Sequence, residues 1–152
     1  MDAKDHQIVR MLQEDGRLTN QELADRVNLS PSPCLRRVRR LEADGVIAGY
    51  TAIIDQKRYG LAITAFLRVR LVRHGEEEVR IFEDRIRALD EVLDCFLMTG
   101  DADYLLRVAV SDLESYESFI RLKMHAIPGI AALDTSFAYG TIKAGRYLPM
   151  TM

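Results

Sequence analysis

Four arginines fall within five consecutive residues: Arg36, Arg37, Arg39 and Arg40. No acidic residue occurs from position 26 to position 41, so no neighbouring carboxylate in the sequence offsets their charge. A guanidinium group is planar and donates two parallel hydrogen bonds to a guanine edge or to a phosphate. The cluster therefore predicts contact with nucleic acid if one element presents the four side chains together.

A helix is the element expected to carry this cluster. Leu35, Val38 and Leu41 recur every three residues, which is typical of the inner face of a helix and leaves the arginines on the outward side. Two Ser-Pro pairs at residues 30–33 suit the first turn of a helix, where proline is tolerated. We therefore expect a helix that starts at one of these two pairs and extends to about residue 43.

Two further helices precede the arginine-rich helix. Ile8 and Leu12 form a short apolar stripe, and residues 19–22 form a capping box pattern that starts a second helix. A short turn at Asn28 and Leu29 then leads to the third helix. This order predicts a helix-turn-helix, whose last helix enters the major groove of DNA. An isolated basic helix is more often a solvated surface, but three successive capped helices with the basic one last favour DNA.

A second constellation lies in a turn that contains Gly100, Asp101 and Asp103. A free amino acid needs an acceptor for its ammonium group and N–H donors for its carboxylate. Either aspartate meets the first need, and the unobstructed backbone at Gly100 meets the second. Glycine and aspartate also suit a tight hairpin, and the spacing alone favours that structural interpretation.

The periodicity of the apolar residues changes near residue 46. Alternation and β-branched residues predict strands over residues 46–54, 64–73, 92–98, 104–110 and 131–142. Helical spacing predicts helices over residues 76–89 and from residue 111 to the Pro-Gly at residues 128–129. Beyond the first strand the order is β-α-β-β-α-β, the ferredoxin-like motif. We predict an α+β chain with a helix-turn-helix domain at 1–45, a hinge strand and linker at 46–60, and a ferredoxin-like domain at 61–152.

Composition and charge are compatible with this division. The 152 residues include 21 basic and 23 acidic side chains, a net charge of −2, but residues 1–45 hold eight of each sign and gather the arginines on one helix. No apolar run is long enough to cross a membrane, and the polar start lacks the order of a signal peptide. The two cysteines, Cys34 and Cys95, form no CxxC pair, so no disulfide framework or zinc site is expected. These features predict a cytoplasmic protein.

Several motifs occur in a specific order along the chain. They are Asp-Gly-Arg at residues 15–17, the Ser-Pro and arginine segment at 29–42, Gly-Val-Ile-Ala-Gly-Tyr at 45–50, Gly-Asp-Ala-Asp-Tyr within 99–106, and Pro-Gly at 128–129. This combination, from about residue 5 to residue 147, resembles the Lrp/AsnC family of bacterial and archaeal transcription regulators. The second, third and fourth segments match the family's recognition helix, linker strand and effector-domain turn.

The resemblance implies a sequence-specific regulator that binds double-stranded DNA and a small effector, usually an amino acid. It also implies dimers, joined through the hinge strand, that assemble into tetramers, octamers or hexadecamers with effectors where dimers meet. DNA contacts are then expected from Ser30, Ser32, Pro33, Arg36, Arg37, Arg39 and Arg40. Effector contacts are expected from Gly100, Asp101, Asp103, Tyr104, Ser136 and Ala138. A pocket that includes Met98, Met124 or Phe137 would prefer leucine or methionine. No cofactor, metal or membrane partner is expected.

The alternative hypothesis is an enzyme. Some proteins of this two-domain fold resemble siroheme decarboxylases, which would need histidines lining the second domain. Here His6, His74 and His125 match no metal or catalytic motif. An RNA-binding sheet is a third possibility, but residues 104–110 offer only one aromatic side chain for base stacking.

Overall fold

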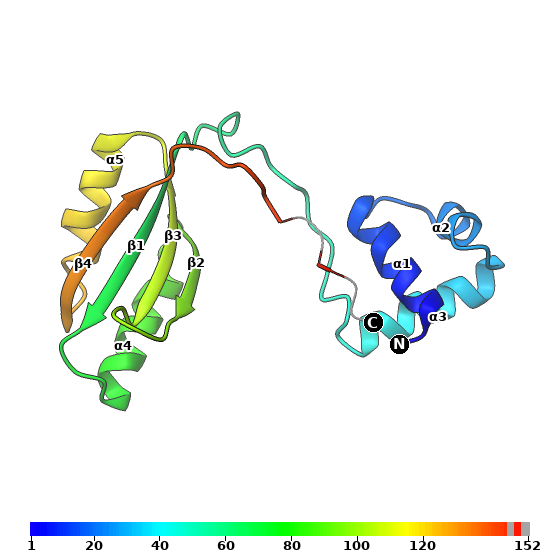
Figure 1. Cartoon of the computed structure of the whole chain (residues 1–152), viewed down its shortest axis with the longest axis horizontal. Helices are drawn as coiled ribbons and strands as arrows, with labels where there is room; N and C mark the ends of the chain where they lie inside the picture. The colour runs from blue at the N-terminus through cyan, green and yellow to red at the C-terminus, as the bar shows by residue number, and fades with distance from the viewer. Residues whose placement is uncertain (146–147, 150–152) are drawn as a thin grey trace. The chain divides into compact units, whose positions relative to one another are not determined.

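The computed structural model divides into two units (Figure 1). The division falls between residues 53 and 54, shortly after the change of periodicity near residue 46. The structure describes residues 1–145, 148 and 149. One unit contains Met1–Ile53 with the described residues from Ile142 onward, and the other contains Ile54–Thr141. The last part of the predicted second domain, residues 146, 147 and 150–152, lies outside the described residues.

Three helices form the first unit. They are α1 (Ala3–Glu14), α2 (Asn20–Arg26) and α3 (Pro31–Ala43). The predicted capping box of α2 is present, because Thr19 accepts from the backbone N–H of Glu22 while the Glu22 carboxylate accepts from that of Thr19. Asn28 adopts a φ of 52° in the turn before α3, a left-handed conformation that asparagine tolerates better than most residues. The helix-turn-helix prediction is confirmed.

The inner face of α3 differs from the sequence prediction at one position. Cys34 and Leu41 are buried and Val38 packs against the same core, whereas Leu35 is 37% exposed. Positions 34, 38 and 41 follow the i, i+4, i+7 spacing of a helical face, so the stripe is equally regular but rotated. The expectation that Leu35 points inward is therefore wrong.

The second unit is a four-stranded antiparallel sheet with two helical segments. The strands are β1 (Ile63–Leu71), β2 (Val92–Leu97), β3 (Tyr104–Val110) and β4 (Ile130–Phe137), in the order β2-β3-β1-β4. The helices are α4 (Glu76–Arg87) and α5 (Leu113–Ser118), which continues as the π-helical η1 (Phe119–Met124). This order and connectivity confirm the predicted ferredoxin-like fold.

Alternation along the strands gives this sheet one buried face and one open face. Leu67 and Leu106, opposite one another on β1 and β3, are fully buried with Phe82 of α4 and Phe119 of η1. Phe66, the neighbour of Leu67, points to the opposite face and is 37% exposed. Side chains at alternate strand positions point to opposite faces, so the helices pack on a single face and leave the other uncovered.

The predicted strands at 64–73 and 92–98 differ from β1 and β2 by one or two residues at their ends, and two others differ more. Residues 46–54 form no strand in the single chain, since a strand needs a hydrogen-bonded neighbour, and their pairing with a second copy stays a prediction. The last strand ends at Phe137 rather than at residue 142, so Ala138 follows the strand, although its N–H still donates to the carbonyl of Thr64. Among the described residues no helix has both the length and the apolar character to cross a membrane.

Replacement of Leu106 by alanine is expected to destabilise the second unit by about 2–5 kcal/mol, because it leaves a cavity in the centre of the core. Urea unfolding followed by circular dichroism measures the effect. The control is Leu93→Ala, at an exposed position of β2, which should change the free energy of unfolding far less. Equal losses in the two variants would contradict the placement of Leu106.

Candidate DNA-binding and effector sites

The start of α3 is fixed by contacts with α2. Ser30 occupies the N-cap position without a side-chain capping bond, and Pro31 is the first helical residue. The side-chain amide of Asn20, at the start of α2, donates to the carbonyl of Pro31 at 2.9 Å. Ser32 is exposed and Pro33 is half-buried in the first turn. The three residues predicted to contact DNA here, Ser30, Ser32 and Pro33, therefore lie together at one end of the helix.

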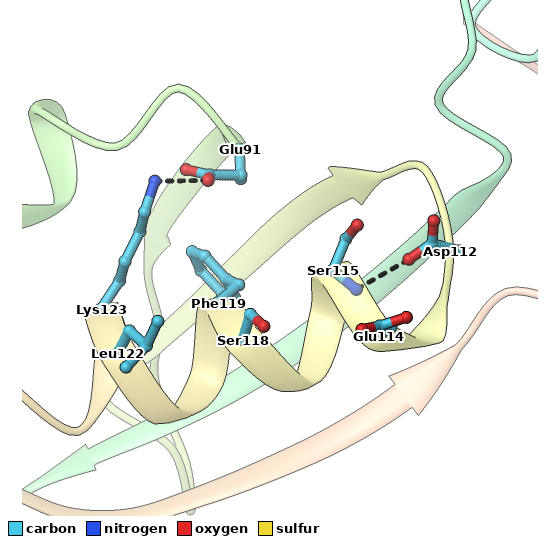
Figure 2. A pocket seen from close by; sticks show the side chains of 8 residues that line it. All are labelled: Glu91, Asp112, Glu114, Ser115, Ser118, Phe119, Leu122 and Lys123. Carbon is cyan, nitrogen blue, oxygen red and sulfur yellow. Dashed lines mark hydrogen bonds and ion pairs between the residues drawn. The ribbon is translucent and has the colours of Figure 1, made fainter.

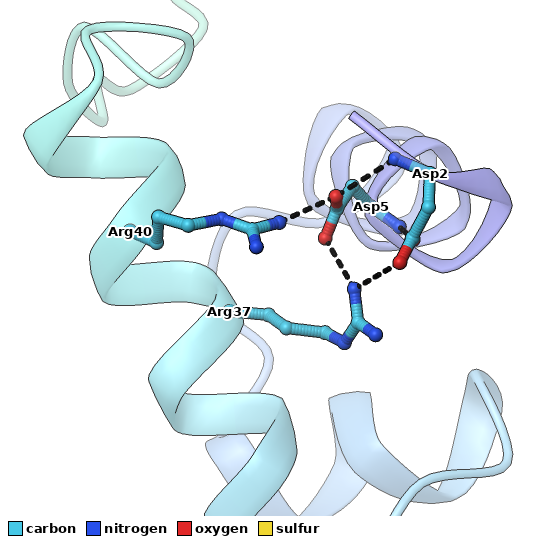
Figure 3. Close-up of polar contacts among 4 residues, drawn as sticks. All are labelled: Asp2, Asp5, Arg37 and Arg40. Carbon is cyan, nitrogen blue, oxygen red and sulfur yellow. Dashed lines mark hydrogen bonds and ion pairs between the residues drawn. The ribbon is translucent and has the colours of Figure 1, made fainter.

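The four arginines of α3 divide into two pairs. Arg37 donates to Asp2 at 2.7 Å and to Asp5 at 2.8 Å, while Arg40 donates to the second oxygen of Asp5 at 2.5 Å (Figure 3). Arg36 and Arg39 are exposed, and no ion pair links them to another described residue. Among the described residues, the structure thus leaves two of the predicted DNA-binding arginines without an ion pair and directs the guanidinium groups of the other two to the start of α1, although the Arg40 side chain is still 52% exposed. Contact of any of them with DNA stays a prediction.

Asp5 is the buried centre of this group, with only 1% of its side chain exposed. Burial by itself would raise the pKa of Asp5, but the backbone N–H of Asp2 and the guanidinium groups of Arg37 and Arg40 outweigh it, so the pKa is lowered. The backbone N–H of Asp5 and the Arg37 side chain lower the pKa of Asp2 to about 2. Both carboxylates are therefore ionised at neutral pH and offset the charge of the two guanidinium groups.

Sequence analysis missed Asp5. Asp2 and Asp5 form a capping box, because each carboxylate accepts from the other residue's backbone N–H at 2.9 Å. An acid at the N-cap followed by another three residues later was the available signal. The ion pair of Asp5 with Arg37 could not be predicted from a local pattern, because the two residues are 32 positions apart in the sequence.

In the Gly-Asp turn, Asp103 and Tyr104 are engaged in holding the domain together. Asp103 accepts from the backbone N–H of Leu71 at 2.8 Å and pairs with His74 at 2.8 Å, and these two contacts lower its pKa. Tyr104 is buried, donates to Glu83 at 3.1 Å and has a pKa raised by burial and by that carboxylate to about 12. Gly100 has a φ of 104°, which favours glycine.

Asp101 is the predicted effector residue that lines a cavity on the open face of the sheet. This cavity of about 540 Å³ also contains Arg68 and Arg70 of β1, and its apolar walls include Met98 and Leu105. Arg68 pairs with Asp134 across β1 and β4 at 3.2 Å. The site thus combines anionic and cationic groups with apolar surface, which suits a zwitterion carrying an apolar side chain.

The other predicted effector residues do not line this cavity. Ser136 lies opposite Phe66 in the sheet and Ala138 follows β4, so neither joins Asp101 in the single chain. Sequence analysis missed Arg68 and Arg70 as candidate ligands. Their alternation with buried residues of β1 placed them on one face, but which residues of other strands share that face depends on the strand register, which the sequence does not reveal.

A second hollow lies beside α5 and η1 (Figure 2). Its carboxylates are Glu91, Asp112 and Glu114, and its single cation is Lys123, which pairs with Glu91 at 2.5 Å. Asp112 caps α5 by accepting from the backbone N–H of Ser115 at 2.7 Å. The excess of negative charge disfavours the carboxylate of an amino acid, so this hollow is the weaker candidate for the effector.

The histidines required by the enzyme hypothesis are divided between the two units. His6 lies on α1, whereas His74 and His125 belong to the second unit, where His74 pairs with Asp103. Within the described residues no cluster of three or more histidine, cysteine or acidic side chains is placed to hold a metal ion.

Comparison with known proteins covers both units. Residues 1–48 match the family model described as a winged helix-turn-helix DNA-binding domain, and residues 64–148 match that of the Lrp/AsnC ligand binding domain. Among curated proteins, the Bkd operon transcriptional regulator of Pseudomonas aeruginosa is 43% identical over 142 residues, 93% of each chain. The leucine-responsive regulatory protein of Escherichia coli is 38% identical over 148 residues, 97% of this chain and 90% of that one.

Solved structures give the same result. A transcriptional regulator of Neisseria meningitidis in complex with L-methionine is 38% identical, with a TM-score of 0.94 over 98% of this chain and 96% of that one. An AsnC family regulator of Agrobacterium tumefaciens is 37% identical, with a TM-score of 0.94 over 98% and 97% of the two chains. Because both units and nearly the whole length agree, the chain belongs to the Lrp/AsnC family of DNA-binding transcriptional regulators.

Proposed function

We propose that this regulator binds an imperfectly palindromic DNA site by placing α3 of each of two copies in successive major grooves. The observation that carries the proposal is an exposed arginine pair, Arg36 and Arg39, on the last helix of a helix-turn-helix unit. Two-fold symmetry of a dimer places two recognition helices about 34 Å apart on one side of the duplex. Half-sites one helical turn apart are then expected.

We further propose that an apolar amino acid, leucine or methionine, is the effector. Asp101 accepts from its ammonium group, Arg68 and Arg70 offer donors to its carboxylate, and Met98 and Leu105 contact its side chain. The methionine complex of the Neisseria relative and the name of the leucine-responsive relative support this class. Such a ligand shifts an equilibrium between assemblies only through unequal affinity for them.

A homo-oligomer is proposed as the active form. The open face of the sheet exposes Phe66 and Phe96 within a surface that also carries the ion pairs Arg68–Asp134 and Arg107–Asp94. Apolar and charged side chains alternate across this face, since Phe66 lies beside Arg107 and Phe96 lies beside Leu105, and interfaces between proteins commonly combine both kinds. A second copy related by two-fold symmetry offers the same surface, so it can cover the apolar side chains and contact the charged ones. Residues 46–54 of the two copies then pair with each other as strands.

The same proposal gives the chain no catalytic role and places it in the cytoplasm. Support comes from the relatives, since the Pseudomonas protein is named a transcriptional regulator and the Escherichia coli protein a regulatory protein. The regulator acts through binding and assembly alone.

DNA recognition is tested by selection from random duplexes. The wild-type chain should enrich an imperfect palindrome with half-sites one turn apart, and its affinity should fall steeply with rising salt, because bound lysines and arginines release counter-ions from phosphates. A scrambled duplex of the same composition is the control. No enrichment, together with equal binding to the scrambled duplex, would refute the DNA proposal.

Effector binding is tested by thermal shift with each of the twenty amino acids. Leucine or methionine should raise the unfolding midpoint most, since a ligand at 100 times its Kd stabilises the native state by about 2.7 kcal/mol. Asp101→Ala should keep the unliganded midpoint and lose the shift, while the exposed control Asp90→Ala should retain it. A full shift in Asp101→Ala would exclude Asp101 as a ligand.

Assembly through the open face is tested by sedimentation. Phe96→Asp introduces a charge at the proposed interface and should shift the chain toward smaller species. Leu113→Asp, at an exposed position of α5 on the helical side of the sheet, is the control and should sediment like the wild type. Identical sedimentation of Phe96→Asp and wild type would contradict an interface on this face.

A further inference from the structure

Resting on the proposed DNA contact of α3, we propose that Asp5 withdraws Arg37 and Arg40 from the DNA and that sequence is recognised by an outer arc of α3. The outer arc consists of Ser32, Leu35, Arg36 and Arg39. Within it, Leu35 contacts the 5-methyl group of a thymine, and the two arginines contact guanine edges or phosphates. Arg37 and Arg40 are positioning residues that hold α3 to the start of α1.

Helix position and the ion pairs with Asp5 together separate the two groups. Arg40 lies four residues after Arg36 and borders the outer arc, but its guanidinium group is directed to Asp5. Positions 32, 35, 36 and 39 follow the i, i+3, i+4, i+7 spacing of one helical face, opposite the buried residues Cys34 and Leu41. Positions 37 and 40 lie three residues apart on the flank that faces α1, where Figure 3 shows both side chains pointing to Asp5. Among the described residues, no ion pair or side-chain hydrogen bond engages the polar members of the outer arc, Ser32, Arg36 and Arg39.

Electrostatics strengthens the separation. Asp2, Asp5, Arg37 and Arg40 together carry no net charge, because both acids are ionised at neutral pH. Counter-ion release from DNA depends on uncompensated positive charge, so this group adds little to the salt dependence of binding. Withdrawal of either guanidinium group would leave the buried carboxylate of Asp5 with one ion pair in place of two, which costs free energy. The two arginines are thus held at Asp5.

Leu35 is the apolar member of an otherwise polar surface. Leu35 is 37% exposed to solvent, whereas its neighbour Cys34 is fully buried in the core of the unit. The thymine methyl group is the apolar feature of the major groove, and apolar side chains recognise it by contact. The flanking Arg36 and Arg39 favour guanine, so each half-site should contain a thymine close to a guanine.

The arginine pairs are compared first, on the duplex selected by the wild-type chain. Arg36→Ala and Arg39→Ala should each weaken binding about 5- to 150-fold where the side chain contacts a base, or reduce the salt slope by about one where it contacts a phosphate. Arg37→Ala and Arg40→Ala should lower the unfolding midpoint and leave the salt slope unchanged. Loss of slope at Arg37 and Arg40 equal to that at Arg36 and Arg39 would overturn the division.

Asp5 itself is tested by Asp5→Asn. Release of the guanidinium groups should strengthen binding to the scrambled duplex, steepen its salt slope by about one, and reduce the preference for the selected duplex. A purely structural role would weaken binding to both duplexes without steepening the slope. Asp44→Asn, at the exposed C-cap of α3, controls for the change in net charge. If Asp5→Asn does not fold, the salt slope of Arg40→Ala decides the question.

Leu35 is tested by replacing each thymine of the selected duplex with deoxyuridine, which lacks the methyl group. Wild-type affinity should fall several-fold at one position in each half-site, and Leu35→Ala should be insensitive at that position while Arg36→Ala remains sensitive. Equal sensitivity of Leu35→Ala and wild type at every position would exclude the methyl contact. If the wild-type chain selects no sequence, the proposed function fails; if it selects one but these variants do not behave as stated, only the present inference fails.

Discussion

A buried carboxylate stays ionised only if hydrogen bonds and opposite charges replace the water it has lost, and Asp5 meets this condition through its contacts with Asp2, Arg37 and Arg40. These contacts fix the direction of two guanidinium groups and tie α3 to the start of α1. The rotation of α3 about its own axis follows from them and from the burial of Cys34 and Leu41. Which side chains of α3 remain available for DNA is then determined by packing within the unit.

A second aspartate has a comparable structural role in the other unit. Asp103 joins the end of β1 to the Gly-Asp turn, because its carboxylate accepts from the backbone N–H of Leu71 and pairs with His74. Tyr104, at the start of β3, packs against Phe82 of α4, with the two ring centroids 4.6 Å apart. These contacts hold the end of the turn in place, and Asp101 remains at its exposed side, beside the arginines of β1. In both units, structural ion pairs and hydrogen bonds engage part of a charged motif, while no ion pair among the described residues engages Arg36, Arg39 or Asp101.

Local patterns allowed much of the fold to be predicted. Capping at Thr19, the prolines before α3 and the alternation in β1 each act over a few residues, so the elements could be placed from sequence with small errors at their ends. The orientation of Leu35 could not, because spacings of three and four residues describe helical faces only some tens of degrees apart. The division of the arginines depends on a partner 32 residues away, and the place of Arg68 and Arg70 beside Asp101 depends on strand register. Neither is a local property.

An amino acid bound by the second unit is expected to alter how the first unit binds DNA. Linkage requires that such a ligand change the DNA affinity or the stoichiometry of the complex, and that DNA change the affinity for the ligand by the same factor. The most direct measurement is a titration of the selected duplex with the wild-type chain, repeated at increasing methionine or leucine concentration, with glutamate as a control. The binding curve should move with methionine or leucine and not with glutamate. Superimposable curves, at concentrations where the thermal shift shows the amino acid to be bound, would contradict it.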